Sequence, residues 1–321
     1  MAQVTGTTDS YDLVGVAEDV EDVIFMISPT ETPMLTMAGR KKADNTLHQW
    51  QTDALAAATS NKQIEGDDAS FTTASPTTML SNYTQISRKT AIVSRTADKV
   101  RKYGRAKELA RLATKYGSEL KRDIEFTLLS NQGSSVGGNA TARQTAGMEA
   151  MIAGNRIVAA TNTTGTTPGY STVWTAPTDG TATATLTEAM LISGIQAAWT
   201  DGGDPSVIML PYGQKAIIAS FTGAAKYAGA YSNSGKAEAA LVGAVSVYIS
   251  DAGEHKLVLN RFQRTRTVFG FDPDYVSVAF LDGIKMEPLA KTGDAEKFML
   301  VTEYCTVADN PDAHFKIQDL P

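Results

Sequence analysis

A long polar segment between two predicted β-strands constrains the fold of this 321-residue chain more than any other feature. Residues 45–52 and 83–93 predict strands, because they contain Leu, Trp, Thr, Ile and Val between polar neighbours. The intervening residues 55–78 are small, polar or acidic. Loops longer than about 15 residues are uncommon in compact domains unless they are functional or disordered. We therefore expect an extended two-stranded hairpin that leaves the body of the molecule.

The hairpin and the N-terminal segment provide candidate contacts between copies of the chain. An isolated hairpin is only marginally stable in water, so an ordered one needs support from another surface. Apolar residues at helical spacing predict a short amphipathic helix before Ser28-Pro29, and this helix has no partner nearby in the sequence. We expect the following residues to contact neighbouring subunits: Val16, Val20, Val23, Ile24, Ile27, Trp50, Glu65, Asp67 and Asp68.

A long one-sided helix over residues 104–130 is the clearest secondary-structure prediction. Its apolar residues recur every three or four positions, and the segment contains no proline. A second helix is predicted from Thr185, where the sequence Thr-Leu-Thr-Glu matches a capping box. A third helix is predicted from Pro211, directly after the apolar strand 207–210.

The last part of the chain predicts a β-meander, because short apolar runs alternate there with turn sequences. Since predicted helices and strands are both present but segregated along the chain, the expected fold class is α+β. The expected strands are 244–250, 256–260, 264–271, 275–280, 284–289 and 298–305.

The charges of the chain are distributed unevenly. The first 39 residues contain seven acidic side chains and no basic one, whereas residues 99–125 contain nine basic and four acidic side chains. The acidic arm and the basic helix could attract each other, or each could be an ordinary solvated face. The basic residues could also touch phosphate, although interleaved acids favour a solvated face. They are Arg101, Lys102, Arg105, Arg111, Lys115, Lys121 and Arg122.

Two sequence motifs resemble enzyme sites but lack the required context. Ser135 lies in a Gly-Ser-Ser-Val-Gly match to the G-x-S-x-G pattern, which requires a strand before the serine and a helix after it. Here a helix precedes and a glycine-rich coil follows, so a flexible turn is favoured over a serine hydrolase. Residues 229–236 resemble a phosphate loop, but the glycine spacing is wrong and Ala237 replaces the required hydroxyl residue.

The remaining composition excludes several other functions. Cys305 is the only cysteine, and the three histidines are far apart, so we expect no closed zinc site and no cofactor. The chain has no run of 18 apolar residues, and residues 1–10 do not form a secretory signal, so no membrane partner is expected. The net charge of −6 argues against bulk attraction to nucleic acid. Together these features predict a protein that is not an enzyme.

An ordered series of short strings resembles the major head proteins of tailed bacteriophages that have the Hong Kong 97-like capsid fold. The resemblance extends over nearly the whole chain, and the series is more specific than any single string. The strings are Ile27-Ser28-Pro29-Thr30-Glu31-Thr32-Pro33, Leu47-His48-Gln49-Trp50-Gln51, Glu65-Gly66-Asp67-Asp68-Ala69, Leu80-Ser81-Asn82-Tyr83-Thr84-Gln85-Ile86, Lys121-Arg122-Asp123 and Lys291-Thr292-Gly293-Asp294.

The resemblance implies a division of the chain into four parts. Residues 1–44 would be an N-terminal arm, and residues 45–94 would be an extended hairpin loop. Residues 95–139 and 256–321 would form a peripheral domain with the long helix as its spine. Residues 140–255 would form an axial domain near the symmetry axis of a capsomer.

The resemblance also implies a self-assembling structural protein of the virion. Copies of the chain would form hexamers and pentamers of an icosahedral shell around double-stranded DNA, contacted without sequence specificity. About 45 residues precede the loop, so the expected scaffolding protein is a separate chain, and a portal and a decoration protein are further expected partners. Assembly would take place in the cytoplasm of a bacterial host. The alternatives are a bacterial nanocompartment shell protein of the same fold and a serine hydrolase using Ser135.

Overall fold

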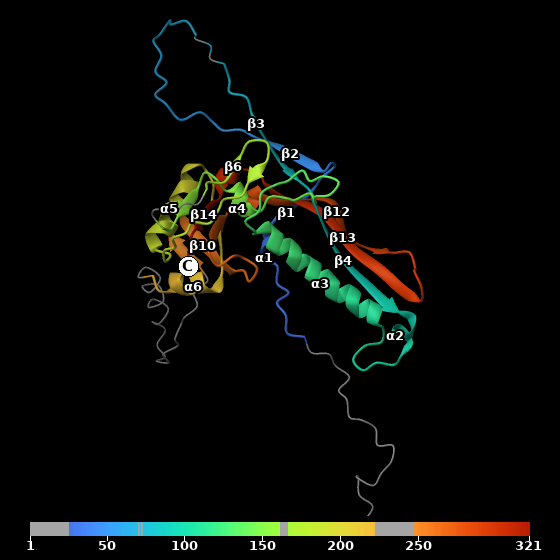
Figure 1. Ribbon diagram of the computed structural model, residues 1–321. Coiled ribbons are helices and arrows are strands. Elements are labelled where there is room, and N and C mark those ends of the chain that lie inside the picture. The colour runs from blue at the N-terminus through green and yellow to red at the C-terminus, as the bar shows by residue number, and fades with distance from the viewer. Residues whose placement is uncertain (1–25, 70, 72, 161–165, 222–246) are drawn as a thin grey trace, which may run out of the picture.

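The computed structural model describes residues 26–69, 71, 73–160, 166–221 and 247–321. The described chain has an elongated part around helix α3 and a more compact part around helices α5 and α6, and a long hairpin projects from their junction (Figure 1). The predicted helix with Val16, Val20, Val23 and Ile24, and the loop 229–236, lie outside the described residues.

The elongated part is a four-stranded sheet covered by one long helix. The strand order is β1 (Gly39–Lys42), β12 (Val276–Pro288), β13 (Ala295–Ala308) and β4 (Gln85–Ser94), and only β1 pairs in parallel. Helix α3 (Glu108–Leu128) packs on β4 and β13, where its Leu120 is fully buried with Phe298. Ser94 caps the short helix α2 (Arg95–Lys99), which connects β4 to α3.

The compact part is built on a six-stranded mixed sheet. The strand order is β5 (Arg156–Val158), β14 (Phe315–Gln318), β11 (Val268–Phe271), β8 (Val207–Leu210), β10 (Gly253–Leu259) and β9 (Val247–Ser250). Helices α5 (Glu188–Thr200) and α6 (Tyr212–Ala219) share one core with alternate residues of β8. Met209 of β8 belongs to the other core, together with residues of α1 (Pro33–Met37), α3 and α4 (Met148–Met151). The two short 3-10 helices are Pro273–Tyr275 and Pro311–Ala313.

Two small hairpins complete the described fold. Strands β2 (Leu47–Thr52) and β3 (Thr78–Tyr83) pair antiparallel in the register Leu47 to Tyr83. Strands β6 (Gly169–Tyr170) and β7 (Trp174–Thr175) place the buried Trp174 against Tyr170, with ring centroids 4.7 Å apart.

The described elements confirm the α+β class and the long helix, but they correct three details. Thr187, not Thr185, caps α5, because the helix begins at Glu188 and the Thr187 hydroxyl accepts a hydrogen bond from the N–H of Met190. The expected meander is wrong, because β10 pairs in parallel with β8 and β11 lies between β8 and β14. The expected strands 275–280 and 284–289 form one irregular strand, β12, with register shifts near Asp282.

The strand pairing also bears on the expected boundary at residue 256. Strand β10 extends across this position, and β11 and β14 belong to the six-stranded sheet. The expected peripheral range 256–321 therefore contains strands of both sheets. Turn sequences marked the ends of these strands, but the partner of each strand depends on contacts between distant residues.

Candidate assembly surfaces

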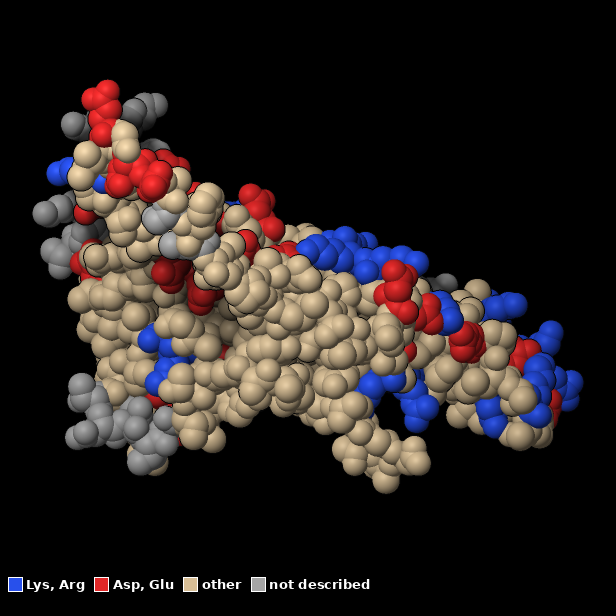
Figure 2. All heavy atoms as spheres, turned by 90° about the horizontal axis from the view of Figure 1, so that it is seen from above, with Lys and Arg blue, Asp and Glu red and all other residues tan. Residues whose placement is uncertain are grey.

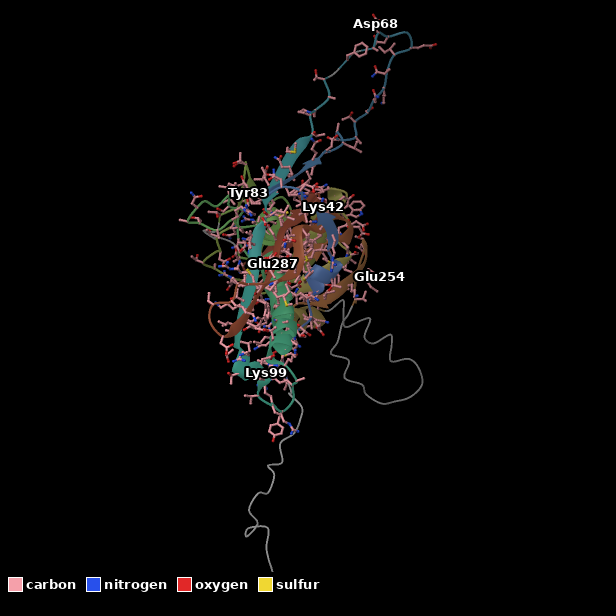
Figure 3. All side chains as sticks on the ribbon, turned by 90° about the vertical axis from the view of Figure 1, so that its right-hand side faces the viewer. Lys42, Asp68, Tyr83, Lys99, Glu254 and Glu287 are labelled. Atoms are coloured by element: carbon pink, nitrogen blue, oxygen red, sulfur yellow. The ribbon has the colours of Figure 1, made fainter. Side chains whose placement is uncertain are left out.

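The hairpin projects far beyond its two paired strands. Residues 53–77 connect β2 to β3, and Asp68 lies near the tip, well away from the body (Figure 3). The apolar side chains of Leu55, Ile64 and Phe71 are 99%, 79% and 96% exposed. Apolar area removed from water stabilises by about 25 cal/mol per Å². Covering this segment with a second surface is therefore energetically favourable.

Trp50 lies at the base of the hairpin and packs against its own chain. Its neighbours include Ala43 of the segment after β1 and Cys305 of β13, and its ring centroid is 6.0 Å from that of His48. Burial and the nearby Lys41 lower the pKa of His48. The expected contact of Trp50 with a neighbouring subunit stays a prediction, and within one chain the residue anchors the hairpin.

A buried asparagine fixes the direction in which the hairpin leaves the body. Asn82 of β3 donates to Thr145 Oγ1 at 2.9 Å and to the carbonyl of Thr306 at 2.7 Å. Its side-chain oxygen accepts from the N–H groups of Tyr83 and Ala146. The Trp174 indole donates to the carbonyl of Ser81 next to it. A fully satisfied polar group of this kind permits one arrangement of its neighbours.

The N-terminal helix α1 is held by a buried carboxylate of the spine helix. Glu125 accepts hydrogen bonds from the N–H groups of Met34 at 2.7 Å and Leu35 at 2.8 Å, and also from the Asn260 side chain. Burial raises the pKa of Glu125, while these three donors act in the opposite direction. One side chain thus connects the N-terminal arm, the spine helix and the end of β10.

The basic residues of the spine region are partly neutralised by their neighbours. Arg105 and Arg111 both pair with Glu108 and lower its pKa, with Arg111 the larger cause. Lys115 lies 3.7 Å from Glu119, Lys102 donates to a carbonyl of α2, and Arg122 lies over the Phe262 ring. Within the described ranges Arg101 and Lys121 have no ion pair. The role of these seven residues as one inner basic face stays a prediction.

Lys and Arg gather toward the end of the molecule that contains α2 (Figure 2). Acidic side chains are interspersed among them, and two acidic residues of α3, Glu108 and Glu119, form ion pairs with basic neighbours. Three further predicted contact residues, Glu65, Asp67 and Asp68, lie in the exposed hairpin loop at a distance from this basic end (Figure 3). Ile27 precedes α1 and is fully exposed.

A second buried charge cluster fixes the C-terminal strand. Arg264 makes two hydrogen bonds to the Glu149 carboxylate, at 2.8 and 2.9 Å, and also pairs with Asp179. Lys316 of β14 is fully buried and donates to the carbonyl of Glu149. Burial lowers the pKa of Lys316 to about 7. No local sequence pattern predicted this cluster, because its members are distant along the chain.

The motifs examined for catalysis have ordinary structural roles. Ser135 forms a bridge with Gln144, and its hydroxyl accepts from the N–H of Gly137, without a strand before it or a helix directly after it. His255 bonds to Ser250 and to the carbonyl of Pro205. Among the residues described, no three His, Cys, Asp or Glu side chains are grouped to hold a metal ion. No helix in the same residues is long and apolar enough to span a membrane.

Known structures show the same fold. The match to a chain in the capsid asymmetric unit of Cyanophage A-1(L) covers 99% of this chain and 99% of that chain, with a TM-score of 0.60 and 15% identity. A structure of the major capsid proteins and decoration proteins of Phage G matches over 100% of both chains, with a TM-score of 0.54 and 8% identity. These similarities confirm the expected Hong Kong 97-like capsid fold.

Sequence comparisons place the chain among phage proteins. It is 42% identical over 124 residues to the major capsid protein of Escherichia phage Phieco32, which is 38% of this chain and 35% of that relative. The aligned region is therefore about a third of the length of the curated relative. The model of the family described as SU10 major capsid protein matches residues 3–321. The chain belongs to the SU10 major capsid protein family.

Proposed function

We propose that this chain is the subunit that builds the icosahedral head of a tailed phage. The observation that supports this most directly is the projecting hairpin, whose apolar side chains Leu55, Ile64 and Phe71 are exposed in the single chain. Such a surface marks a site of protein association. In a shell, the hairpin and the N-terminal arm of each subunit extend over neighbouring subunits and bury these residues.

The proposed division of labour follows the two sheets. The four-stranded sheet with α3 is the peripheral part, and the six-stranded sheet with α5 and α6 is the axial part near the symmetry axis of a capsomer. Residues 1–44 are the arm and residues 45–94 contain the extended loop. Strands β10, β11 and β14 join the axial part despite their late position in the chain.

The proposed partners are copies of the same chain, arranged as hexamers and pentamers. A separate scaffolding protein and a portal assist assembly in the cytoplasm of the bacterial host, and the finished shell encloses double-stranded DNA without sequence-specific contacts. The Phage G structure contains decoration proteins beside its major capsid proteins, so a decoration protein is a further proposed partner. The proposed role requires no catalytic activity, no cofactor and no membrane.

Shortening the hairpin tests this function. Deleting residues 55–76 leaves Asp53, Ala54 and Thr77 as a three-residue connection between β2 and β3, which suits an antiparallel pair. We expect a folded chain with unchanged circular dichroism that forms no closed shells in electron micrographs.

A matched variant keeps the loop length and removes only its apolar side chains. The triple substitution Leu55→Ser, Ile64→Ser and Phe71→Ser should reduce the yield of shells without changing the thermal unfolding of the single chain. Normal shells from both variants would exclude the hairpin as the main assembly contact.

A further inference from the structure

Helix α5 presents an outer face without charged side chains. Glu188 in the first turn is its only charged residue, and positions 189–200 contain none. Leu191 and Ile195 pack in the core below the helix, whereas Ile192 and Trp199 on the outer face are 47% and 64% exposed. A helix at the surface of a soluble protein usually has charged residues opposite its apolar stripe. The outer face of α5 is therefore suited to contact with another protein surface.

A groove lies between this face and the edge strand β9. It has a volume of about 660 Å³, and Ile192, Trp199 and Ile249 line it together with the acidic residues Glu188 and Asp251. These acidic side chains repel phosphate and also repel the acidic hairpin loop of a neighbouring copy. The groove therefore favours an occupant other than DNA or the hairpin.

The opposite face of the same six-stranded sheet contains an apolar cleft. Side chains alternate between the two faces of a strand, so Ile208 of β8 packs with α5 and α6, whereas Met209 packs with α1. Helices α5 and α1 thus lie on opposite sides of the sheet (Figure 1). Helix α1 covers only part of its side and leaves a cleft of about 480 Å³. The apolar residues that line this cleft are Pro33, Met37, Val207, Met209 and Val258.

The charges at the groove and at the cleft are complementary. Lys256 of β10 lines the cleft and is exposed, and Glu31 lies at the side of α1. Within the described ranges neither Lys256 nor Asp251 has an ion pair. Exposed ion pairs contribute little free energy. The charges therefore orient a contact between these surfaces, and apolar contact stabilises it.

Two different surfaces on opposite faces of one sheet suit a head-to-tail contact between identical chains. Such a contact, repeated by rotation, closes a ring. An exposed tryptophan that fills a pocket of the partner is a common centre of an interface. Trp199 and the cleft form a pair of this kind, whereas two α5 helices facing each other would bring Glu188 and Asp251 of both copies together.

We propose that α5 of one copy docks on the cleft beside α1 of the next copy, with the Trp199 side chain against Met37 and Val258. The contact repeats around a ring and joins the compact parts of the copies within one capsomer. The hairpin is not part of this contact and remains free to cover a different region of a neighbour. This inference rests on the proposed function and adds the two surfaces that close the ring.

Disulfide trapping in assembled shells tests the contact. The variant Gln196→Cys with Thr36→Cys places one thiol on the outer face of α5 and one at the cleft, both at exposed positions. Cys305 does not interfere, because it is buried and burial raises its pKa to about 12. Complete oxidation should give a ladder of species longer than a dimer on non-reducing gels, because each copy joins two others. Dimers alone, or shells without cross-links, overturn the proposal.

Two further variants identify other occupants. Gln196→Cys alone gives dimers if two α5 helices face each other, and Thr36→Cys with Ser60→Cys gives cross-links if the hairpin loop fills the cleft. Both variants should remain reduced, and cross-linking of either to the extent of the first pair overturns the proposal. Shells in which the first pair remains reduced contradict this contact alone. A parent chain that forms no shells contradicts the proposed function, and this contact with it.

Removing the indole provides an independent measurement. Trp199→Ala should raise the protein concentration needed for shell assembly about tenfold, because the contact loses its largest apolar anchor. Thermal unfolding of the unassembled chain should not change, because Trp199 is mostly exposed there. The matched control is Tyr212→Ala in α6, which removes an aromatic side chain that is 80% exposed and lies outside both the groove and the cleft. Equal effects of the two substitutions on assembly contradict the docking of Trp199.

Discussion

Single buried polar residues determine where the assembly segments leave the body of this capsid protein. Asn82 fixes the hairpin and Glu125 fixes the N-terminal helix, and both make several hydrogen bonds to distant parts of the chain. Removing one partner from such a group leaves the others buried without hydrogen bonds, which costs more free energy than the bond itself contributes. These residues therefore contribute mainly to specific geometry.

Glu125 provides a direct test of this view. Glu125→Ala leaves the N–H groups of Met34 and Leu35 and the amide of Asn260 without their acceptor, and should lower the free energy of unfolding by about 3 kcal/mol. Urea titration of the unassembled chain measures the change. Glu119→Ala, on the same helix but in a partly exposed ion pair, should cost less than about 1 kcal/mol. Equal losses would contradict a special role for Glu125.

His314 makes stability depend on pH. It is fully buried, donates from Nε2 to the carbonyl of Tyr275 and accepts at Nδ1 from the N–H of Asp272. Burial lowers the pKa of His314 from 6.5 to about 4. The unfolded chain therefore binds a proton more readily, so stability is fully present above pH 6.5 and falls as the pH decreases toward 4.

The loss expected from His314 is about 3 kcal/mol between pH 6.5 and 4. His314→Gln can replace one or both hydrogen bonds but does not titrate, so its unfolding midpoint in urea should change less over this range. His48→Gln is the control, because His48 is only half-buried. If the unfolding midpoint of His314→Gln changed with pH as much as that of the parent chain, the pH dependence would belong to other groups.

At the scale of elements, periodicity predicted the helices and the turns but not the partners of the strands. Residues 108–128 form the expected helix, because its apolar stripe is long and uninterrupted by proline. The local patterns of β10, β11 and β14 did not distinguish a meander from the mixed six-stranded sheet. Their pairing depends on contacts such as that of Phe315, which packs between two glycines of other elements.

Phe315 determines how closely α5 approaches the sheet. A Cβ atom on Gly270 of β11 would lie 2.0 Å from the Phe315 ring, and one on Gly194 of α5 would lie 2.5 Å from it. Gly270→Ala should therefore lower the thermal stability of the unassembled chain, by about 2 kcal/mol, through overpacking. Gly283→Ala in β12, where the added atom meets nothing within 4 Å, should have little effect. Comparable melting temperatures of the two variants would contradict this packing.

The assembly surfaces were predictable in outline only. The long polar segment between two strands indicated the hairpin, and the uneven charge indicated an arm and a basic helix. Asn82, Glu125 and the cluster around Glu149 were not predicted, because each acts on backbone or side-chain groups more than 60 positions away. Glu125 left one weak signal, a carboxylate next to the apolar stripe of the long helix.

At the scale of the whole molecule, two compact sheets share a core and two extended segments project from them. The core formed by Met34, Leu128, Met209 and Phe271 joins both sheets and the spine helix. The hairpin projects from the molecule at the end opposite α2 (Figure 1), and the apolar side chains of its loop are exposed. In the proposed shell, neighbouring copies of the chain cover these exposed side chains.

Electron cryomicroscopy of shells assembled from the purified chain tests this account most directly. The account predicts closed particles of hexamers and pentamers in which residues 53–77 of each subunit lie on a neighbouring subunit, with Leu55, Ile64 and Phe71 buried there. A chain that remains monomeric under assembly conditions, or shells in which these three side chains remain exposed to solvent, would contradict it.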